Sequence, residues 1–230
     1  MFQGFNDETF EFFMAIRFNN NVDFFHGNHE WYRRSVREPC LALAEALGPV
    51  IEQIDGDLER RPNRVVARIN RDIRFSHDKS PYRDYLWLSF HRVGGDDRHN
   101  HPGFYFDLSS DGGSYGMGYY RPDRRMMDAF RRQLCIEPER IAQICAPLLE
   151  TFHFCSETYR RMRIPDCVPE SLRALYPVKG FYFEKPVRDF ELLKSPALRD
   201  EIADGFSRLA PLYQYLNSLT PLEQEDTSRL

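Results

Sequence analysis

The chain has 230 residues, of which 42% are apolar and 29% are charged. This apolar share is too high for an intrinsically disordered chain and is enough for a buried core. The formal net charge of -4 argues against a protein that coats nucleic acid over its whole surface, but it leaves room for a local basic patch. No run approaches the ~20 apolar residues that a membrane-spanning helix needs, and the first residues lack a signal-peptide pattern.

The first quarter of the chain predicts helices. Residues 6–18 predict a helix with an asparagine or aspartate cap, and the three asparagines at 19–21 end it. Residues 22–55 predict further helix, because apolar residues recur there at spacings of three and four. Pro39 and Pro49 each remove a backbone donor, so we expect kinks near them.

The middle of the chain predicts strands. Short strands are expected at 65–70 and 86–90, on either side of a polar connection. The clearest signal is an antiparallel hairpin at 103–120, in which two runs of alternating side chains flank the turn residues 109–113.

The remainder predicts helices that begin near residues 123, 138 and 196, and a strand at 180–184, whereas 151–178 shows no clear pattern. The expected fold is therefore α+β, with a central, mostly antiparallel sheet flanked by N-terminal and C-terminal helices. We expect residues 1–219 to form a single domain and the polar residues 220–230 to form a frayed tail.

The cysteine pattern predicts reduced thiols in a cytoplasmic protein. The number of cysteines is odd and no Cys-x-x-Cys pair occurs, which argues against a disulfide framework. The cysteines are Cys40, Cys135, Cys145, Cys155 and Cys167.

Two further patterns have ordinary explanations. His26 and His29 lie one helical turn apart, but the order His-x-x-His-Glu matches no zinc-enzyme motif, so an exposed helix face explains them better. Arg131 and Arg132 likewise predict a solvated helix face. We expect neither a metal nor a cofactor.

The most informative segment is basic. Residues 60–83 hold eight Lys or Arg against two Asp, and 71–83 form a long polar connection. Such connections are often functional, and guanidinium groups bind carboxylate or phosphate through paired hydrogen bonds. The alternative is an internal salt-bridge network, with Asp72 bound to Arg74 and Asp78 bound to Lys79 or Arg83.

Strand residues near the hairpin could complete such a site. Gly116 and Gly118 leave one strand face bare beside Tyr120, which would admit a flat ligand unless a helix covers the glycines. If the protein is an enzyme, Asp72 and Asp78 are the candidate general bases. The candidate ligand-binding residues are Arg71, Arg74, Ser76, Lys79, Ser80, Tyr82, Arg83, Tyr105, Gly116, Gly118 and Tyr120, with Asn20 and Asn21 as further candidates.

Residues 71–83 read R-D-I-R-F-S-H-D-K-S-P-Y-R, which closely resembles the central R-D-x-R-F-S-x-D-K-S-P-Y-K/R signature of the domain of unknown function 2461 family of bacteria and fungi. Segments 20–25, 36–39 and 116–122 are similar to other family motifs, although Val22 stands where the family usually has Arg and Phe24 where it usually has Trp. The resemblance extends from about residue 5 to 217. It implies a specific role for 71–83 and supplies no reaction.

Two functions follow as hypotheses. The first is a pocket around 71–83 for an anionic metabolite that carries a carboxylate or a phosphate. The second is a non-catalytic module whose basic segment binds nucleic acid or an acidic protein. Binding to a polyanion should weaken steeply with salt, whereas a concave pocket should be less sensitive. Neither hypothesis involves a membrane.

Overall fold

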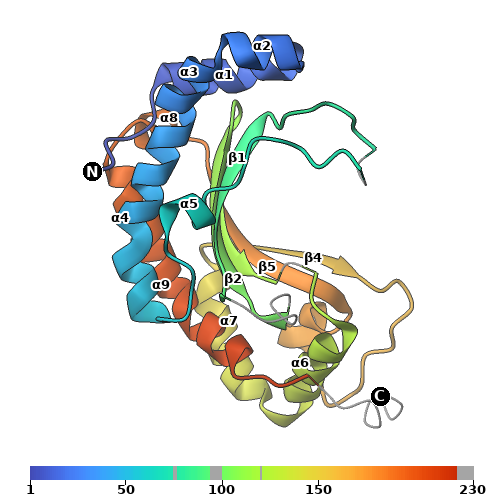
Figure 1. Ribbon diagram of the computed structural model, residues 1–230. Helices are drawn as coiled ribbons and strands as arrows, with labels where there is room; N and C mark the ends of the chain where they lie inside the picture. The colour runs from blue at the N-terminus through green and yellow to red at the C-terminus, as the bar shows by residue number, and fades with distance from the viewer. Residues whose placement is uncertain (75–76, 94–99, 120, 222–230) are drawn as a thin grey trace. The chain divides into compact units, whose positions relative to one another are not determined.

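The computed structural model describes residues 1–74, 77–93, 100–119 and 121–221. It confirms an α+β fold with a five-stranded antiparallel sheet and flanking helices (Figure 1). None of the described helices combines the length and the apolar character that crossing a membrane requires. The helices are α1 (Asp7–Phe18), α2 (Val22–Gly27), α3 (His29–Tyr32), the π-helix η1 (Arg33–Arg37), α4 (Glu38–Ile54), α5 (Pro62–Val65), α6 (Arg124–Ile136), α7 (Pro138–Leu149), the 3-10 helix η3 (Glu170–Leu175), α8 (Phe190–Leu193) and α9 (Ala197–Asn217).

The sheet has the strand order β1-β2-β3-β5-β4. The predicted hairpin is present as β2 and β3, and β5 is longer than expected. The strands are β1 (Tyr85–Phe90), β2 (Gly103–Ser109), β3 (Gly112–Gly118), β4 (His153–Thr158) and β5 (Val178–Val187). Gly112 has a φ of 119° in the hairpin turn, a conformation that favours glycine.

The chain divides into two compact units by its contacts. Unit 1 is Met1–Phe90, Tyr105–Tyr115 and Pro186–Gly205; unit 2 is His91–Phe104, Gly116–Lys185 and Phe206–Leu230. The boundary passes through β2, β3, β5 and α9. A single domain over residues 1–219 therefore stays a prediction, and 222–230 lie outside the described residues.

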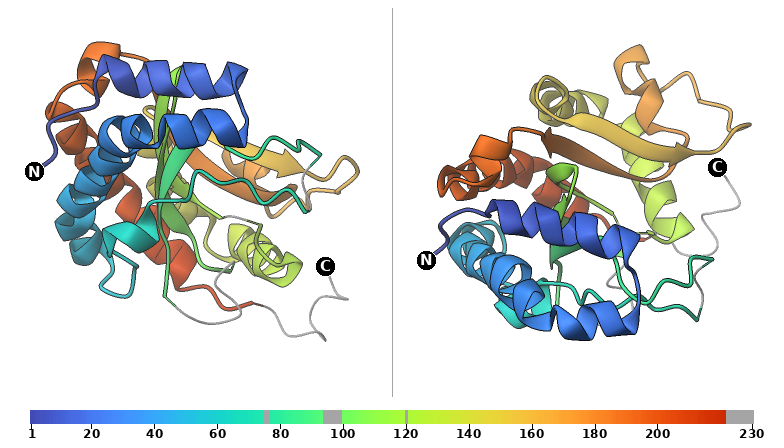
Figure 2. Two further views of the ribbon diagram at one scale, coloured as in Figure 1. Left: turned by 45° about the horizontal axis from the view of Figure 1, so that its top comes forward. Right: turned by 90° about the horizontal axis from the view of Figure 1, so that it is seen from above.

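Unit 1 packs the N-terminal helices against β1. Helix α4 contacts β1, and α1 lies beside α3 and η1 (Figures 1 and 2). Alternate residues Leu86, Leu88 and Phe90 of β1 are fully buried, so the side chains between them belong to the opposite face of the strand. This alternation places Tyr85 and Trp87 on the side of β1 that faces away from the core.

The predicted strand at 65–70 is wrong. Residues Pro62–Val65 form α5, and the following segment makes only isolated bridges, Val66 with Leu88 and Asn70 with Tyr82. The physical reason is a side chain, because Arg37 Nη1 donates to the carbonyl oxygens of Val66 and Ala67, at 3.2 and 2.9 Å. These two carbonyls therefore bind a guanidinium instead of the N–H groups of a neighbouring strand.

Unit 2 has an aromatic core between β4, β5 and α6. Strands β4 and β5 pair in antiparallel fashion, with Phe154 opposite Phe183. Phe130 of α6 lies over Phe181, with ring centroids 5.1 Å apart.

Arg131 is only 2% exposed, which corrects the prediction of a solvated face. It is buried because it pairs with Asp128 and donates to backbone carbonyls that precede and begin β5, at Tyr176 (2.9 Å) and Val178.

The prediction of five reduced cysteines is also wrong. Cys135 and Cys167 form a disulfide, with Cα atoms 5.1 Å apart. Sequence spacing did not indicate this pair, because its members are 32 residues apart and only the folding of unit 2 brings them together. Cys40 and Cys145 are buried, and burial raises the pKa of both thiols to about 12. Cys155 is only partly buried, which also raises its thiol pKa.

We predict that a thiol reagent modifies Cys155 before Cys40 and Cys145 in the native, unreduced protein, because Cys155 is partly exposed whereas the other two thiols are buried and protonated. Denaturation without reductant should expose three reactive thiols, and reduction should add Cys135 and Cys167. Alkylation followed by peptide mass mapping measures this. Five modified cysteines in the denatured, unreduced protein would contradict the disulfide.

Two helical glycines in unit 1 differ in their surroundings. Gly205 of α9 lies against the buried ring of Tyr115, so that an added Cβ would come within 2.2 Å of a ring carbon. The Tyr115 hydroxyl donates to Glu201 Oε1 at 2.8 Å, which fixes the ring in that position. By contrast, a Cβ at Gly48 of α4 would meet no atom of another part of the structure within 4 Å, and only its chain neighbour Pro49 restricts it.

We predict unequal effects for the two alanine substitutions. Gly48→Ala should change the free energy of unfolding by less than about 1 kcal/mol, because the lost unfolded-state entropy is opposed by the contact between the new Cβ and the Pro49 ring that follows it in α4. Gly205→Ala should lower it by about 1–3 kcal/mol, because the Tyr115 ring must move. Denaturant unfolding of both variants checks this. A Gly205→Ala protein as stable as Gly48→Ala would show that the contact is not close in solution.

Candidate functional site

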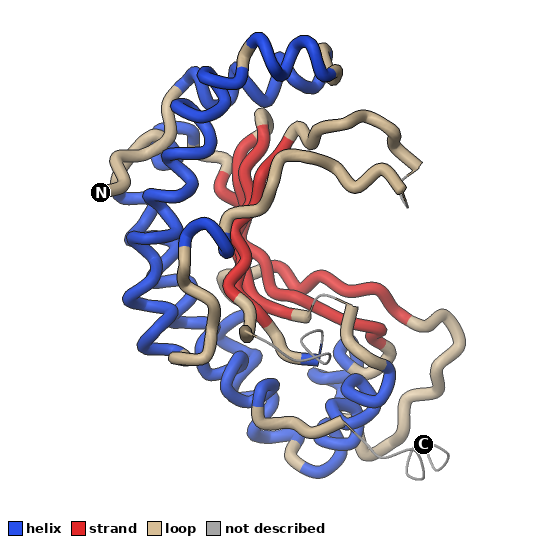
Figure 3. Tube along the Cα trace, in the orientation of Figure 1, coloured by secondary structure: helices blue, strands red, loops and turns tan. Residues whose placement is uncertain are grey.

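The candidate site is the loop at residues 71–83, which belongs to unit 1 and joins the segment after α5 to β1. Figure 3 shows it without helix or strand along its described length. Its two ends meet at a neck around the Asn70–Tyr82 bridge. There Arg71 N–H donates to the Pro81 carbonyl at 2.8 Å, and Arg83 N–H donates to the Ile69 carbonyl at 2.9 Å. The neck closes the loop on itself.

Asn20 holds this neck from the end of α1. Its Nδ2 donates to the Tyr82 carbonyl at 2.9 Å, and its Oδ1 accepts from Tyr82 N–H at 3.0 Å. The Tyr82 ring is buried and stacks on Phe25 with centroids 4.2 Å apart. Asn21 instead caps α2 by accepting from Phe24 N–H. Of the two asparagines, Asn20 is therefore the one that contacts the loop.

Two cations of the loop are paired with its two carboxylates. Arg74 binds Asp72 through two hydrogen bonds of 2.9 and 2.7 Å. Arg71 lies 3.1 Å from Asp78, so Asp78 pairs with Arg71 rather than with Lys79 or Arg83. Part of the internal salt-bridge network considered from the sequence is thus present.

The other cations are held by neutral groups. Lys79 Nζ donates to the Ile73 carbonyl at 2.8 Å, and Arg83 Nη1 donates to the carbonyls of Arg68, at 2.9 Å, and Asn70. A carbonyl orients a cation but does not cancel its charge. Within the described residues, no carboxylate forms an ion pair with Arg68, Lys79 or Arg83. The positive charges of these three side chains are therefore not neutralised by a direct ion pair.

The two carboxylates are weak bases. Hydrogen bonds from Arg74 lower the pKa of Asp72 to about 2, and hydrogen bonds from Ser80 N–H and Oγ lower that of Asp78. Both are ionised at neutral pH, which suits ion pairing better than proton abstraction. Their role as general bases stays a prediction that the local electrostatics do not favour.

The remaining candidates are not gathered at the loop by any described contact. Tyr105 is half-buried in the unit 1 part of β2, whereas Gly116 and Gly118 belong to unit 2. A Cβ at Gly118 would come within 2.4 Å of Tyr182 Cβ, so the close approach of β5 explains this glycine rather than a ligand or a helix. Ser76 and Tyr120 lie outside the described residues.

The sequence reasoning missed two aromatic residues beside the neck. Tyr85 is 39% exposed and stacks on Trp87, with centroids 5.8 Å apart. The Arg83 guanidinium lies over the Trp87 ring at 4.8 Å. The available signal was the alternation of Tyr85 and Trp87 with Leu86 and Leu88 on a strand, which places both aromatic side chains on one face.

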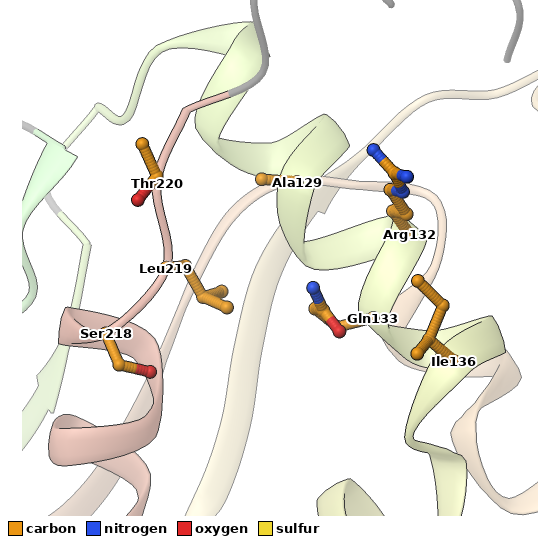
Figure 4. Close-up of a pocket in the computed structure, with 7 residues that line it drawn as sticks. All are labelled: Ala129, Arg132, Gln133, Ile136, Ser218, Leu219 and Thr220. Atoms are coloured by element: carbon orange, nitrogen blue, oxygen red, sulfur yellow. The ribbon is translucent and has the colours of Figure 1, made fainter.

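The other parts of the described structure contain neither a second cluster of candidate residues nor a metal-binding group. A groove of about 340 Å³ in unit 2 lies between α6 and the residues after α9, and it includes no candidate residue (Figure 4). Across the described parts of the chain, no group of three or more His, Cys, Asp or Glu side chains could hold a metal ion. The groove is lined by Ala129, Arg132, Gln133, Ile136, Ser218, Leu219 and Thr220.

A family model described as "Conserved hypothetical protein (DUF2461)" matches residues 8–215. The chain belongs to this family. The match confirms the resemblance seen in the sequence, and it covers both the whole loop and Asn20, whose side chain binds the neck. A search of curated proteins found no match to the chain. Membership of the DUF2461 family therefore adds no assigned reaction to the geometry.

We predict that Asn20→Ala loosens the neck. Both hydrogen bonds to Tyr82 are lost, which should lower the free energy of unfolding by about 1–3 kcal/mol and speed amide exchange at Tyr82. Asn19→Ala is the matched control, because among the described residues the Asn19 side chain donates only to the Ala15 carbonyl of its own helix. If the Tyr82 amide of Asn20→Ala exchanged as slowly as that of the wild type, the two Asn20–Tyr82 hydrogen bonds would be contradicted.

Proposed function

We propose that the loop at 71–83 and its neck bind an anionic small molecule that carries a carboxylate or a phosphate. The observation that carries this proposal is the set of three cations, Arg68, Lys79 and Arg83, without a carboxylate partner among the described residues. Cations of this kind favour an external anion, because no internal salt bridge has to be broken first.

The way two of these cations, Lys79 and Arg83, are fixed supports the proposal. Arg83 is restrained by two carbonyls and by the Trp87 ring, and Lys79 by one carbonyl. The conformational entropy of these side chains is therefore partly lost on folding rather than on binding. Such restraint favours a defined ligand over a diffuse counterion cloud.

One observation favours the alternative, a binding module for nucleic acid or an acidic protein. The Arg74 side chain is 76% exposed although it is paired with Asp72, which itself is 52% exposed. A pair this exposed contributes little to stability and can exchange partners with an incoming polyanion. The two functions differ in their salt dependence, since polyanion binding releases many counterions.

The proposal includes no reaction. A cytoplasmic location, predicted from the cysteine pattern, stays a prediction, and the Cys135–Cys167 disulfide counts against it because cytoplasmic thiols are usually kept reduced.

We predict that inorganic phosphate, pyrophosphate or citrate raises the melting temperature of the wild-type protein in a saturable way. The double variant Arg68→Gln, Lys79→Gln should weaken that binding by ~10-fold or more, because each charge-assisted hydrogen bond contributes about 1.5–3 kcal/mol. The substitutions retain the Arg68 carbonyl that Arg83 uses. Thermal unfolding against ligand concentration measures both effects.

Arg34→Gln is the control, because it removes one exposed charge that is paired with Glu8 outside the loop. It should bind these anions as the wild type does. If no small anion shifts the wild type, or if the double variant responds equally, the anion site is wrong. Binding of heparin alone, with a steep loss between 50 and 200 mM salt, would favour the polyanion module instead.

A further inference from the structure

The solvent-facing side of β1 carries an aromatic pair that the fold does not require. Tyr85 and Trp87 stack with an interplanar angle of 30°, and Tyr85 is 39% exposed. Leu86, Leu88 and Phe90 on the other side already supply the contribution of β1 to the core. Trp87 is half-buried, so both rings forgo part of the stabilisation that full burial would give them.

The polar atoms of both rings are unused. Taking the described parts of the chain together, neither the Tyr85 hydroxyl nor the Trp87 indole N–H has a hydrogen-bond partner. Tyrosine and tryptophan rings that combine apolar area with an unused donor are typical of binding surfaces. The pair therefore offers both a stacking face and hydrogen-bond donors to a ligand.

The cationic neck borders this pair directly. Arg83 lies over Trp87, and the carbonyls that hold its guanidinium belong to Arg68 and Asn70. Arg83 therefore brings a cationic group and the aromatic pair together at the start of β1.

We propose that the ligand is a nucleoside phosphate, whose base stacks on the Tyr85–Trp87 pair while its phosphate binds at Arg68, Lys79 and Arg83. This inference rests on the proposed anion site and adds the planar ring to it. Aromatic stacking beside guanidinium groups is the combination that proteins use for nucleotides and single strands. A free nucleotide and a single-stranded nucleic acid share this chemistry, and the experiment separates them.

The test compares ligands that have the same phosphate with and without the base. Titration calorimetry of the wild-type protein should show that the tightest of AMP, CMP, GMP and UMP binds ~10-fold or more tightly than ribose 5-phosphate, which lacks a base. Equal affinities would overturn the nucleoside phosphate and leave the anion site standing. If neither nucleotides, ribose 5-phosphate nor the inorganic anions bind, both proposals fail.

Variants then locate the base. Tyr85→Ala should weaken nucleotide binding by ~10-fold and leave ribose 5-phosphate unchanged, whereas Tyr85→Phe should keep most of the affinity because it keeps the ring. Tyr182→Ala is the matched control, since Tyr182 is also 39% exposed but belongs to β5 in unit 2. Nucleotide binding that is unchanged in Tyr85→Ala would overturn the assignment of the stacking site.

A last arm identifies the source of the nucleoside phosphate. Binding of a ten-residue single-stranded oligonucleotide that is far tighter than the mononucleotide, and that falls steeply between 50 and 200 mM salt, would support nucleic acid. Mononucleotide binding as tight as that of the oligonucleotide would support a free nucleotide. In either case Tyr85→Ala must weaken the complex, and an oligonucleotide that binds this variant as well as wild type would contradict the proposal.

Discussion

One side chain, the amide of Asn20, binds both the N–H and the carbonyl of Tyr82, and the geometry of the basic loop depends on this contact. A primary amide reproduces the pairing that a neighbouring strand would supply, so it adds a second set of hydrogen bonds to the single Asn70–Tyr82 bridge of the neck. One turn earlier, Arg17 binds Asp84 at 2.7 Å and Asp111 at 2.9 Å. The end of α1 therefore fixes the loop, the start of β1 and the hairpin turn together.

A second constraint concerns charge. The loop region has more cations than carboxylates, and two of the surplus cations, Lys79 and Arg83, donate to carbonyl oxygens instead of pairing with acids. Such bonds set the direction of a guanidinium or ammonium group and preserve its positive field. The same Arg83 that is fixed in this way also covers Trp87, so the cationic and aromatic groups share one residue. This shared residue is why the two proposals concern a single surface.

The fold was largely predictable where a pattern repeats. The hairpin of β2 and β3, the helical spacing that became α4, and the helices α6, α7 and α9 follow from periodic burial, which is local information. Residues 65–70 were mispredicted because the Arg37 side chain, distant in sequence, takes two of their carbonyls. Arg131 was mispredicted because a charge can be buried when carbonyls and a carboxylate surround it.

The sequence by itself determined the family, the α+β class and the basic character of residues 71–83, since motif identity, periodicity and charge are written in the order of the residues. Only the tertiary structure decided which cations are neutralised, that Asn20 rather than Asn21 holds the neck, and that Cys135 meets Cys167. It also showed that Tyr85 and Trp87 face outward beside Arg83. These facts depend on which distant side chains become neighbours, and that is set by packing.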